Sequence, residues 1–428
     1  EVAVPSGLFS EPESLITDFV DSKTGGSLPV IKVDGNGGLH AAWRQSPKPD
    51  PSLEAILYRY RSSGGEWGPM EIVEEHATGS VLKPSGMAVG ADGKVAIVWD
   101  EDLGIFDEEG NEFCNDVYYK IREPGGGWSP VYVVVQVAAP AWPDCSQSRP
   151  DVAIDDKGGF HFVWDDQRHD PPEGESYIIG ADIYYRRTPS GLPEDFGPEV
   201  RLTEVTQGSV HPRIHAGPYG AVHVVWATNH DEPGPDKYWI KYRRKPAWAD
   251  EFEWEETVDW LEDHGQRVPE VAEDDSGRAH LAWLEYKEFL VMNIHYRQRG
   301  FEPGSFNEEE TVVDNSFPKG GVSRGLALAV APDGTAHIAW HQDNGFMDAT
   351  GDYDVYYVSR HSGWWPQAWS MPVEINPDAS GNQKNPSLAI APDGTLHAVW
   401  EDASAGLTYE SSGNEYPRSD VFHAILGP

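Results

Sequence analysis

Six residues that can carry a positive charge recur along this 428-residue chain, each just ahead of an apolar segment. They are Lys83, Arg149, His211, Arg267, Arg324 and Lys384. Guanidinium groups match planar oxyanions through paired hydrogen bonds, and an ammonium group attracts them as a point charge. The set could therefore bind a carboxylate or sulfate group of a ligand. The alternative is that these cations only neutralise neighbouring acidic loops.

Acidic residues cluster in several polar segments and offer oxygen ligands. The segment that follows Trp164 carries Asp165, Asp166 and Asp170. Ca²⁺ prefers oxygen ligands of this kind, so we predict a calcium site here, although the spacing does not match an EF-hand loop. The alternative is an ordinary solvated acidic loop.

Several residues near predicted strand ends could act in acid–base chemistry, since paired carboxylates with a positioned Tyr or His can cleave a glycosidic bond. The candidates are Glu285, Tyr286, Asp343, Glu401, Asp402, His211, His230 and His341. The sequence does not give the distances between them, so no catalytic residue is assigned.

The chain has two cysteines, Cys114 and Cys145, and no Cys-x-x-Cys motif. Zinc ribbons and attached haem are therefore not supported. We predict a disulfide between the two cysteines that braces two loops, which would agree with an oxidising compartment.

A repeat that spans the chain positions these residues. In its clearest copy, residues 387–400, two apolar segments flank an Asp-Gly pair and the second ends at Trp400. The same pattern ends at Trp43, Trp99, Trp164, Trp226, Trp283 and Trp340, at intervals of 56 to 65 residues. Such a period predicts a repeat architecture. The Asp-Gly pair supplies the positive φ that a tight hairpin requires.

Each repeat contains four strand-like segments, which in the sixth copy lie near residues 326–331, 335–340, 354–357 and 372–375. An aromatic residue opens the fourth segment in most copies: Trp67, Trp128, Phe196, Trp254, Phe306 and Trp369. Four antiparallel strands per unit, repeated radially, make a β-propeller. The predicted fold is therefore an all-β propeller with seven blades.

The two ends of the chain complete this count. The last repeat stops after its third strand, while residues 7–16 resemble an isolated fourth strand. We expect residues 1–20 to supply the outer strand of the last blade, so that residues 1–428 form one closed domain without an open sheet edge. In such a ring, the first strand of each blade begins on one face of the propeller. The loop between the second and third strands of each blade emerges on the same face. We call this the top face, and the six cations belong to it.

Six histidines stand three positions before a closing tryptophan: His40, His161, His223, His280, His337 and His397. One histidine per blade cannot converge on one centre. We therefore expect a structural role for them, with the imidazole hydrogen-bonded. The closing tryptophans and the Tyr-Tyr pairs are expected to pack within and between blades.

Composition limits the partners. The formal charge is −39, from 71 acidic and 32 basic residues, which opposes binding to nucleic acids. No apolar run is long enough to span a membrane. The chain begins at Glu1, as expected of a secreted protein whose signal peptide has been removed. The sequence does not decide whether the protein associates with copies of itself.

The repeat resembles the sialidase-like superfamily of secreted β-propellers, through the Asp-Gly-x-x-His-x-x-Trp units at 333–340 and 393–400 and the Asp-Ile-Tyr-Tyr unit at 182–185. The resemblance covers essentially the whole chain. It departs from sialidases in three respects: their Asp-box is not reproduced, no Arg-Ile-Pro motif accompanies Arg149, Arg267 and Arg324, and seven blades are expected instead of six. Some polysaccharide lyases that act on uronic acids have a similar propeller with seven blades.

One fold hosts many functions, so two functional classes stay open. The first is a secreted or cell-surface module that binds a glycan or a protein on its top face without catalysis, or that forms part of an extracellular assembly. The second is a carbohydrate-active enzyme, either a polysaccharide lyase or a sialidase-like glycosidase, that uses the cations of the top face. Regular repeats without an outstanding catalytic signature favour the first.

Overall fold

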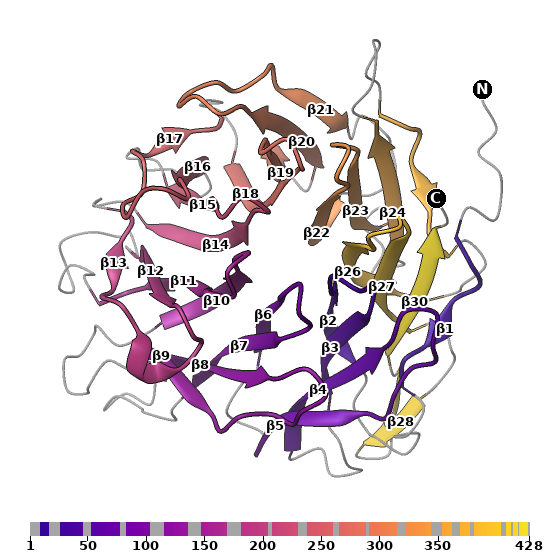
Figure 1. The fold of residues 1–428 in the computed structure, drawn as a ribbon. Coiled ribbons are helices and arrows are strands. Elements are labelled where there is room, and N and C mark those ends of the chain that lie inside the picture. Colours follow the sequence, from indigo (N-terminus) through magenta and orange to yellow (C-terminus); the bar gives the residue numbers. More distant parts are fainter. Residues whose placement is uncertain are drawn as a thin grey trace, which may run out of the picture.

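Seven four-stranded antiparallel sheets stand radially around a central channel (Figure 1). The structure is a computed structural model that describes residues 9–16, 26–45, 53–77, 83–102, 115–135, 147–168, 181–203, 208–229, 238–259, 265–287, 291–314, 322–343, 353–361, 369–376, 381–403, 408–411, 414–417 and 419–426. Six blades use four strands in chain order, and the seventh combines both ends of the chain. The seven-bladed propeller predicted from the repeat is confirmed.

The strands run from the channel outward in each blade. Blade 1 comprises β2 (Ser27–Val33), β3 (Leu39–Gln45), β4 (Leu53–Arg61) and β5 (Glu71–Ala77). Blade 2 comprises β6 (Lys83–Val89), β7 (Val95–Asp102), β8 (Asn115–Arg122) and β9 (Tyr132–Val135). Blade 3 comprises β10 (Gln147–Ile154), β11 (Phe160–Asp166), β12 (Asp182–Thr188) and β13 (Val200–Arg201), with a 3₁₀ turn, η1 (Pro193–Asp195), ahead of β13. Blade 4 comprises β14 (Ser209–Ala216), β15 (Val222–Asn229), β16 (Tyr238–Lys245) and β17 (Glu256–Thr257).

The remaining blades follow the same order. Blade 5 comprises β18 (Gly265–Glu273), β19 (Ala279–Lys287), β20 (Val291–Arg299) and β21 (Glu310–Val313). Blade 6 comprises β22 (Val322–Val330), β23 (Ala336–Asp343), β24 (Tyr353–Arg360) and β25 (Val373–Glu374). Blade 7 comprises β26 (Gln383–Ile390), β27 (Leu396–Asp402), β30 (Asp420–Leu426) and β1 (Glu13–Ser14). A small hairpin, β28 (Thr408–Ser411) and β29 (Asn414–Pro417), lies between β27 and β30 in the chain.

The N-terminal segment closes the ring as the sequence predicts. Glu13 in β1 pairs with His423 in β30, and Phe9 bridges Leu426. The Glu13 carboxylate also contacts His423 Nδ1 at 2.7 Å and Arg61 Nη1 of blade 1 at 2.8 Å. The hydrogen bond from His423 is the main reason that the pKa of Glu13 is lowered to about 2. One side chain therefore joins the last blade to the first.

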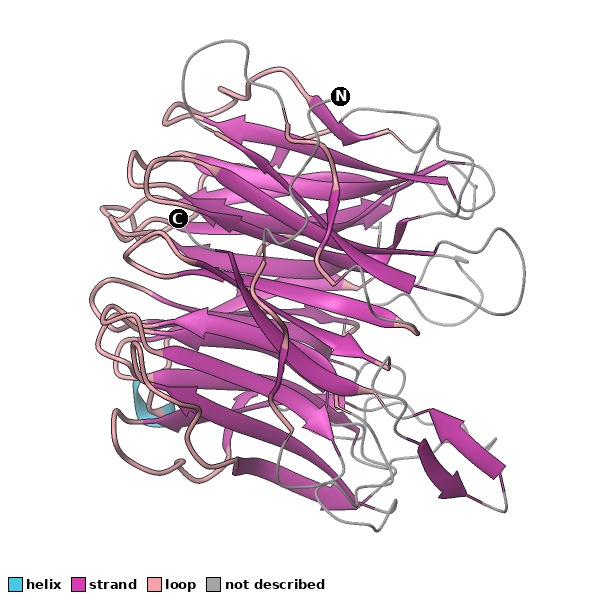
Figure 2. Cartoon of the chain, turned by 90° about the vertical axis from the view of Figure 1, so that its right-hand side faces the viewer, coloured by secondary structure: helices cyan, strands magenta, loops and turns pink. Residues whose placement is uncertain are grey.

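Tight turns join the first and second strands of every blade on the face opposite the top face. We call it the turn face, and the described turns gather along one side of the molecule in Figure 2. A glycine with φ between 76° and 87° stands in each of the seven turns: Gly37, Gly93, Gly158, Gly220, Gly277, Gly334 and Gly394. Gly334 illustrates the geometry, since its N–H donates to the carbonyl of Ala331 at 2.8 Å. The positive φ expected from the Asp-Gly pair is confirmed.

Each blade packs on the next through the residues that the repeat conserves. The seven closing tryptophans are almost completely buried. The histidine three positions before the tryptophan contacts a tyrosine hydroxyl through Nδ1, as His161 does with Tyr185 at 2.7 Å. The second ring nitrogen of His161 contacts the Asp155 carboxylate of the turn at 3.0 Å. The structural role predicted for these histidines is confirmed, and His397 contacts His423 instead of a tyrosine.

The sequence predicts Trp254 as the aromatic residue that opens the fourth strand of blade 4, and this prediction is wrong. Phe252 packs edge-on against Tyr185 of blade 3, as Phe196 packs against Tyr119 one blade earlier. Trp254 is instead 72% exposed. Phe252 stands four residues before β17, as Phe196 stands four residues before β13, so Trp254 lies two residues beyond the packing position.

Candidate functional site

A bulge interrupts the pairing of every innermost strand with its neighbour near the top face. In five blades a residue other than glycine adopts a φ of 50° to 56° at this bulge: Leu28, Arg149, His211, Val268 and Asn385. A proline follows each of them. This conformation costs a non-glycine residue about 1–2 kcal/mol, so the surrounding structure must hold it. The proline that follows each of these five residues is the signal in the sequence that could have located the bulges.

The residue after the closing tryptophan of one blade holds the bulge of the next. The N–H of His211 donates to Asp165 Oδ2 at 3.3 Å, that of Asn385 to His341 Nδ1 at 3.2 Å, and that of Leu28 to Glu401 Oε1 at 2.5 Å. Burial lowers the pKa of His341 to about 4, so the ring is neutral and can accept this bond. The acid–base candidates His341 and Glu401 therefore have positioning roles in the scaffold.

The six predicted cations occupy two successive positions of the repeat. Arg149 and His211 stand at the positive-φ position. Lys83, Arg267 and Lys384 stand one position earlier, where each pairs with the residue after the closing tryptophan. Arg324 lies in the bulge of β22, between the paired residues Val322 and Leu326. The side chains of Lys83 and Arg324 are not among those that the structure describes.

Blades 3 to 5 bring two of these arginines together with tyrosines. Arg149 Nη1 contacts Asp165 Oδ2 at 2.7 Å, yet the arginine side chain stays 46% exposed. The nearby Asp165 carboxylate is the main cause of the raised pKa of Arg149, and Tyr238 also contributes. The guanidinium carbon of Arg267 lies 4.5 Å from the ring centre of Tyr238 and 5.6 Å from that of Tyr286. We call Arg149, Tyr238, Arg267 and Tyr286 the top-face cluster.

A second cation–aromatic pair lies at the equivalent position two blades further on. Lys384 Nζ of blade 7 lies 4.0 Å from the ring centre of Tyr353 in blade 6. Tyr353 and Tyr238 both pair with the residue three positions after a closing tryptophan, Asp343 and Asn229 respectively. The structure thus places Arg267 and Lys384 in the same environment on two sides of the channel mouth.

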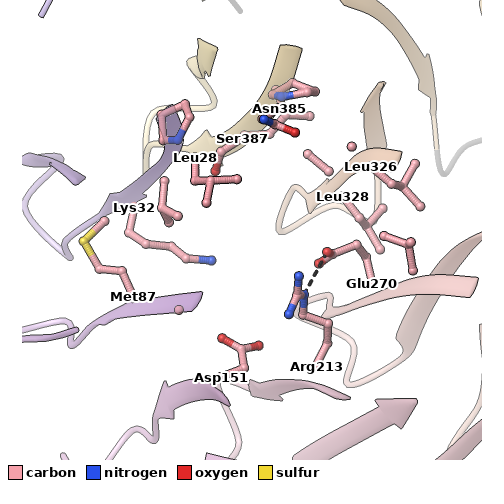
Figure 3. Close-up of a pocket in the computed structure, with 18 residues that line it drawn as sticks. Leu28, Lys32, Met87, Asp151, Arg213, Glu270, Leu326, Leu328, Asn385 and Ser387 are labelled. Carbon is pink, nitrogen blue, oxygen red and sulfur yellow. Dashed lines mark hydrogen bonds and ion pairs between the residues drawn. The ribbon is translucent and has the colours of Figure 1, made fainter. Parts of the chain in front are cut away.

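Below this mouth the channel holds a hollow of about 270 Å³ that carries charged side chains (Figure 3). Arg213 Nε contacts Glu270 Oε1 at 3.1 Å. The Asp151 carboxylate accepts the backbone N–H of Val152 at 2.9 Å and that of Ile214 in the next blade at 3.0 Å. Burial raises the pKa of Asp151 and of Glu270. Lys32 also lines this hollow.

Three of these charged residues, Asp151, Arg213 and Glu270, belong to the neighbouring blades 3 to 5, one sector of the ring. The register that holds Asp151, Arg213 and Glu270 in blades 3 to 5 holds small or apolar residues elsewhere: Val30, Gly86, Ala327 and Ser387. Arg213 of this sector and Lys32 of blade 1 balance the two carboxylates across the channel. The channel therefore offers polar groups of both signs to a bound molecule, directly beneath the top-face cluster.

The predicted calcium ligands are held by hydrogen-bond donors. Asp165 accepts from Ser148 Oγ at 2.5 Å in addition to Arg149, and Asp166 accepts from Trp164 Nε1 at 2.8 Å and from Arg168. Among the described side chains, no group of three or more His, Cys, Asp or Glu residues could hold a metal ion. Asp170, Cys114, Cys145 and His230 lie outside the described residues, so the calcium site and the disulfide stay predictions.

Blade 5 contains a buried charged group that the repeat pattern obscures. His295 replaces the first tyrosine of the third strand and stacks on Trp283, with ring centres 5.8 Å apart. Its Nε2 contacts Glu285 at 2.9 Å and its Nδ1 contacts Glu309 at 2.7 Å. These two carboxylates raise the pKa of His295 to about 9 against the opposing effect of burial. Glu285, another acid–base candidate, is therefore engaged with a protonated histidine.

Comparison with known proteins identifies the fold. No protein-family model and no curated protein sequence matches the chain. A polysaccharide lyase of the PL25 family, an ulvan lyase bound to -[GlcA(1-4)Rha3S]-, matches with a TM-score of 0.59 and 10% identity over 95% of this chain and 94% of its own. A protein of unknown function from Dyadobacter fermentans matches with a TM-score of 0.53 and 10% identity over 97% and 98% of the two chains. A Hadza microbial sialidase matches with a TM-score of 0.50 and 11% identity over 86% and 73%. The predicted resemblance to sialidase-like propellers is thus confirmed for the fold.

Proposed function

We propose that this propeller is a non-catalytic module that binds an acidic glycan at the mouth of its channel. The observation that carries the proposal is the position of Arg267 over the rings of Tyr238 and Tyr286, together with the half-exposed Arg149 near Tyr238. Guanidinium groups bind carboxylates and sulfates through paired, charge-assisted hydrogen bonds. Tyrosine rings supply amphipathic surface for the carbon skeleton of a sugar.

The positions of the acid–base candidates favour binding over catalysis. His341 and Glu401 support the bulges of neighbouring blades, and Glu285 contacts His295. A general acid or base must instead reach the proton that it transfers. These three side chains are used by the scaffold, whereas the arginines and tyrosines of the top-face cluster lie at the channel mouth.

A carbohydrate-active enzyme is the second candidate, and a specific finding favours it. The PL25 polysaccharide lyase shares this fold and holds the ligand -[GlcA(1-4)Rha3S]-, which contains glucuronic acid and a sulfated rhamnose. A lyase on acidic polysaccharide could use the same cations to neutralise the substrate. Tyr286 and His211 would then be the nearest candidates for proton transfer.

The proposal also concerns where the protein works. Acidic glycans are abundant outside cells, and a net charge of −39 suits a protein that must stay dispersed there. Among the described residues, no helix is long and apolar enough to cross a membrane. We therefore propose a secreted or cell-surface location, in which the turn face is free for other contacts. Glycan-bound copies could also assemble, since a polysaccharide carries many sites for one module.

Calorimetric titration with a uronic-acid polysaccharide and a sulfated polysaccharide tests the proposal, together with an assay for unsaturated and reducing sugar ends. We expect binding without product. Arg267→Ala should weaken binding at least tenfold, because a hydrogen bond to a charged group contributes about 1.5–3 kcal/mol. Lys157→Ala, an exposed cation on the turn face, is the control and should bind normally. Product formation would establish the enzyme instead, and absence of binding to both polysaccharides would refute the proposal.

A further inference from the structure

The turn face carries an aromatic hollow that the repeat does not require. Tyr219, Trp248 and Phe301 line it together, and they are 62%, 86% and 55% exposed. They come from the β14–β15 turn and from the connections that follow β16 and β20. The hollow measures about 440 Å³. Solvent-exposed aromatic groups gathered around one concavity usually mark a binding site.

Two walls of this hollow, Tyr219 and Phe301, are held in place by contacts within the protein. The Tyr219 hydroxyl donates to the carbonyl of Asp275 at 2.7 Å and so ties the turn of blade 4 to that of blade 5. Arg244 Nη1 donates to the carbonyl of Phe301 at 3.3 Å. The Phe301 ring lies close against Gly277, where a Cβ atom would stand 2.8 Å from it. A preformed site loses little conformational freedom on binding.

The polar groups of the hollow decide which ligand fits. Arg244 supplies hydrogen-bond donors, Asp275 supplies acceptors, and Ser276 can do both. A sugar hydroxyl can donate and accept, so it can pair with each of them. A pyranose ring also presents an apolar face of C–H groups to an aromatic ring. An acidic ligand would meet the exposed Asp275 carboxylate of the hollow.

A second copy of the chain fits less well. Each copy carries a formal charge of −39, and two such surfaces repel each other at short range. A neutral polysaccharide meets no such repulsion. From the aromatic walls, the mixed polar rim and the exposed Asp275 carboxylate, we infer that the hollow between Tyr219, Trp248 and Phe301 binds an uncharged oligosaccharide. This site is separate from the top-face cluster and does not depend on the function proposed there.

Calorimetric titration of the intact protein with neutral hexasaccharides of glucose, mannose, xylose or galactose tests this inference. We expect at least one of the four to bind, and Trp248→Ala to weaken that binding at least tenfold. Trp254→Ala is the matched control, since Trp254 is 72% exposed but does not line the hollow. It should bind the sugar as the unmodified protein does, and so should Arg267→Ala on the top face.

Three results would overturn the inference. The first is that none of the four hexasaccharides binds. The second is that Trp248→Ala binds as well as the unmodified protein. The third is a dimer in sedimentation velocity that is lost in Trp248→Ala, which would assign the hollow to a second copy of the chain. Circular dichroism and the melting temperature confirm that each variant is folded, as expected for changes at exposed side chains.

Discussion

The protonated His295 of blade 5 should make the stability of this propeller depend on pH in the alkaline range. Its pKa is raised to about 9 by Glu285 and Glu309, against about 6.5 in an unfolded chain. A histidine with a raised pKa stabilises the fold fully below pH 6.5, and this contribution is lost as the pH rises through 9. The interval of about 2.5 pH units corresponds to about 3 kcal/mol, at 1.36 kcal/mol per unit.

Urea unfolding of the unmodified protein and of His295→Gln at pH 6, 8 and 10 measures this contribution. We expect the difference in the free energy of unfolding between the two proteins to shrink by about 3 kcal/mol from pH 6 to pH 10. The substitution His361→Gln controls for general effects, since His361 is exposed. A difference that stays constant over this pH range would refute the assignment of a buried imidazolium between two carboxylates.

Two further predictions compare a buried position with an exposed one. Trp226→Ala should lower the free energy of unfolding by about 3–5 kcal/mol, because it leaves a cavity in the core. Trp254→Ala should change the free energy of unfolding by less than about 0.5 kcal/mol, because Trp254 is exposed. Urea unfolding of both variants would measure the two changes, and equal losses would contradict the burial of Trp226. Gly217→Ala should cost about 1–3 kcal/mol, because a methyl group there would overlap the Glu273 carboxylate, and Gly127→Ala, which faces open space, should be neutral. Melting curves of the two glycine variants would check this, and a neutral Gly217→Ala would show that Glu273 moves aside freely.

Most of the fold could be predicted because the repeat encodes it several times over. The closing tryptophans give the number of blades, and the turn glycines fix the hairpins. The isolated segment around Glu13 predicts the ring closure, since blade 7 lacks a fourth strand. Each of these signals rests on local geometry that must be met in every copy. If one copy of the repeat is interpreted wrongly, the other copies still predict the same blade structure.

The site could be predicted only in part, because it depends on register. The sequence shows that cations precede the innermost strands, but the bulge puts Arg149 and Arg267 at different positions of their blades. A shift of one residue at a bulge changes the direction of a side chain. In the same way, Phe252 occupies the packing position four residues before β17, and Trp254 is left exposed. Neither shift alters the spacing of the tryptophans, so the repeat pattern does not reveal them.

The departures from the repeat share one sector of the ring. Blades 3 to 5 hold the Arg149–Asp165 pair on the top face, Arg213 and Glu270 in the channel, and the hollow beside Trp248 on the turn face. The remaining blades place small or apolar residues at the corresponding channel register. A scaffold role alone does not require such asymmetry, because neutral residues fill the same register elsewhere in the ring. Ligand recognition does require it, since a ligand without sevenfold symmetry can contact only part of a sevenfold scaffold.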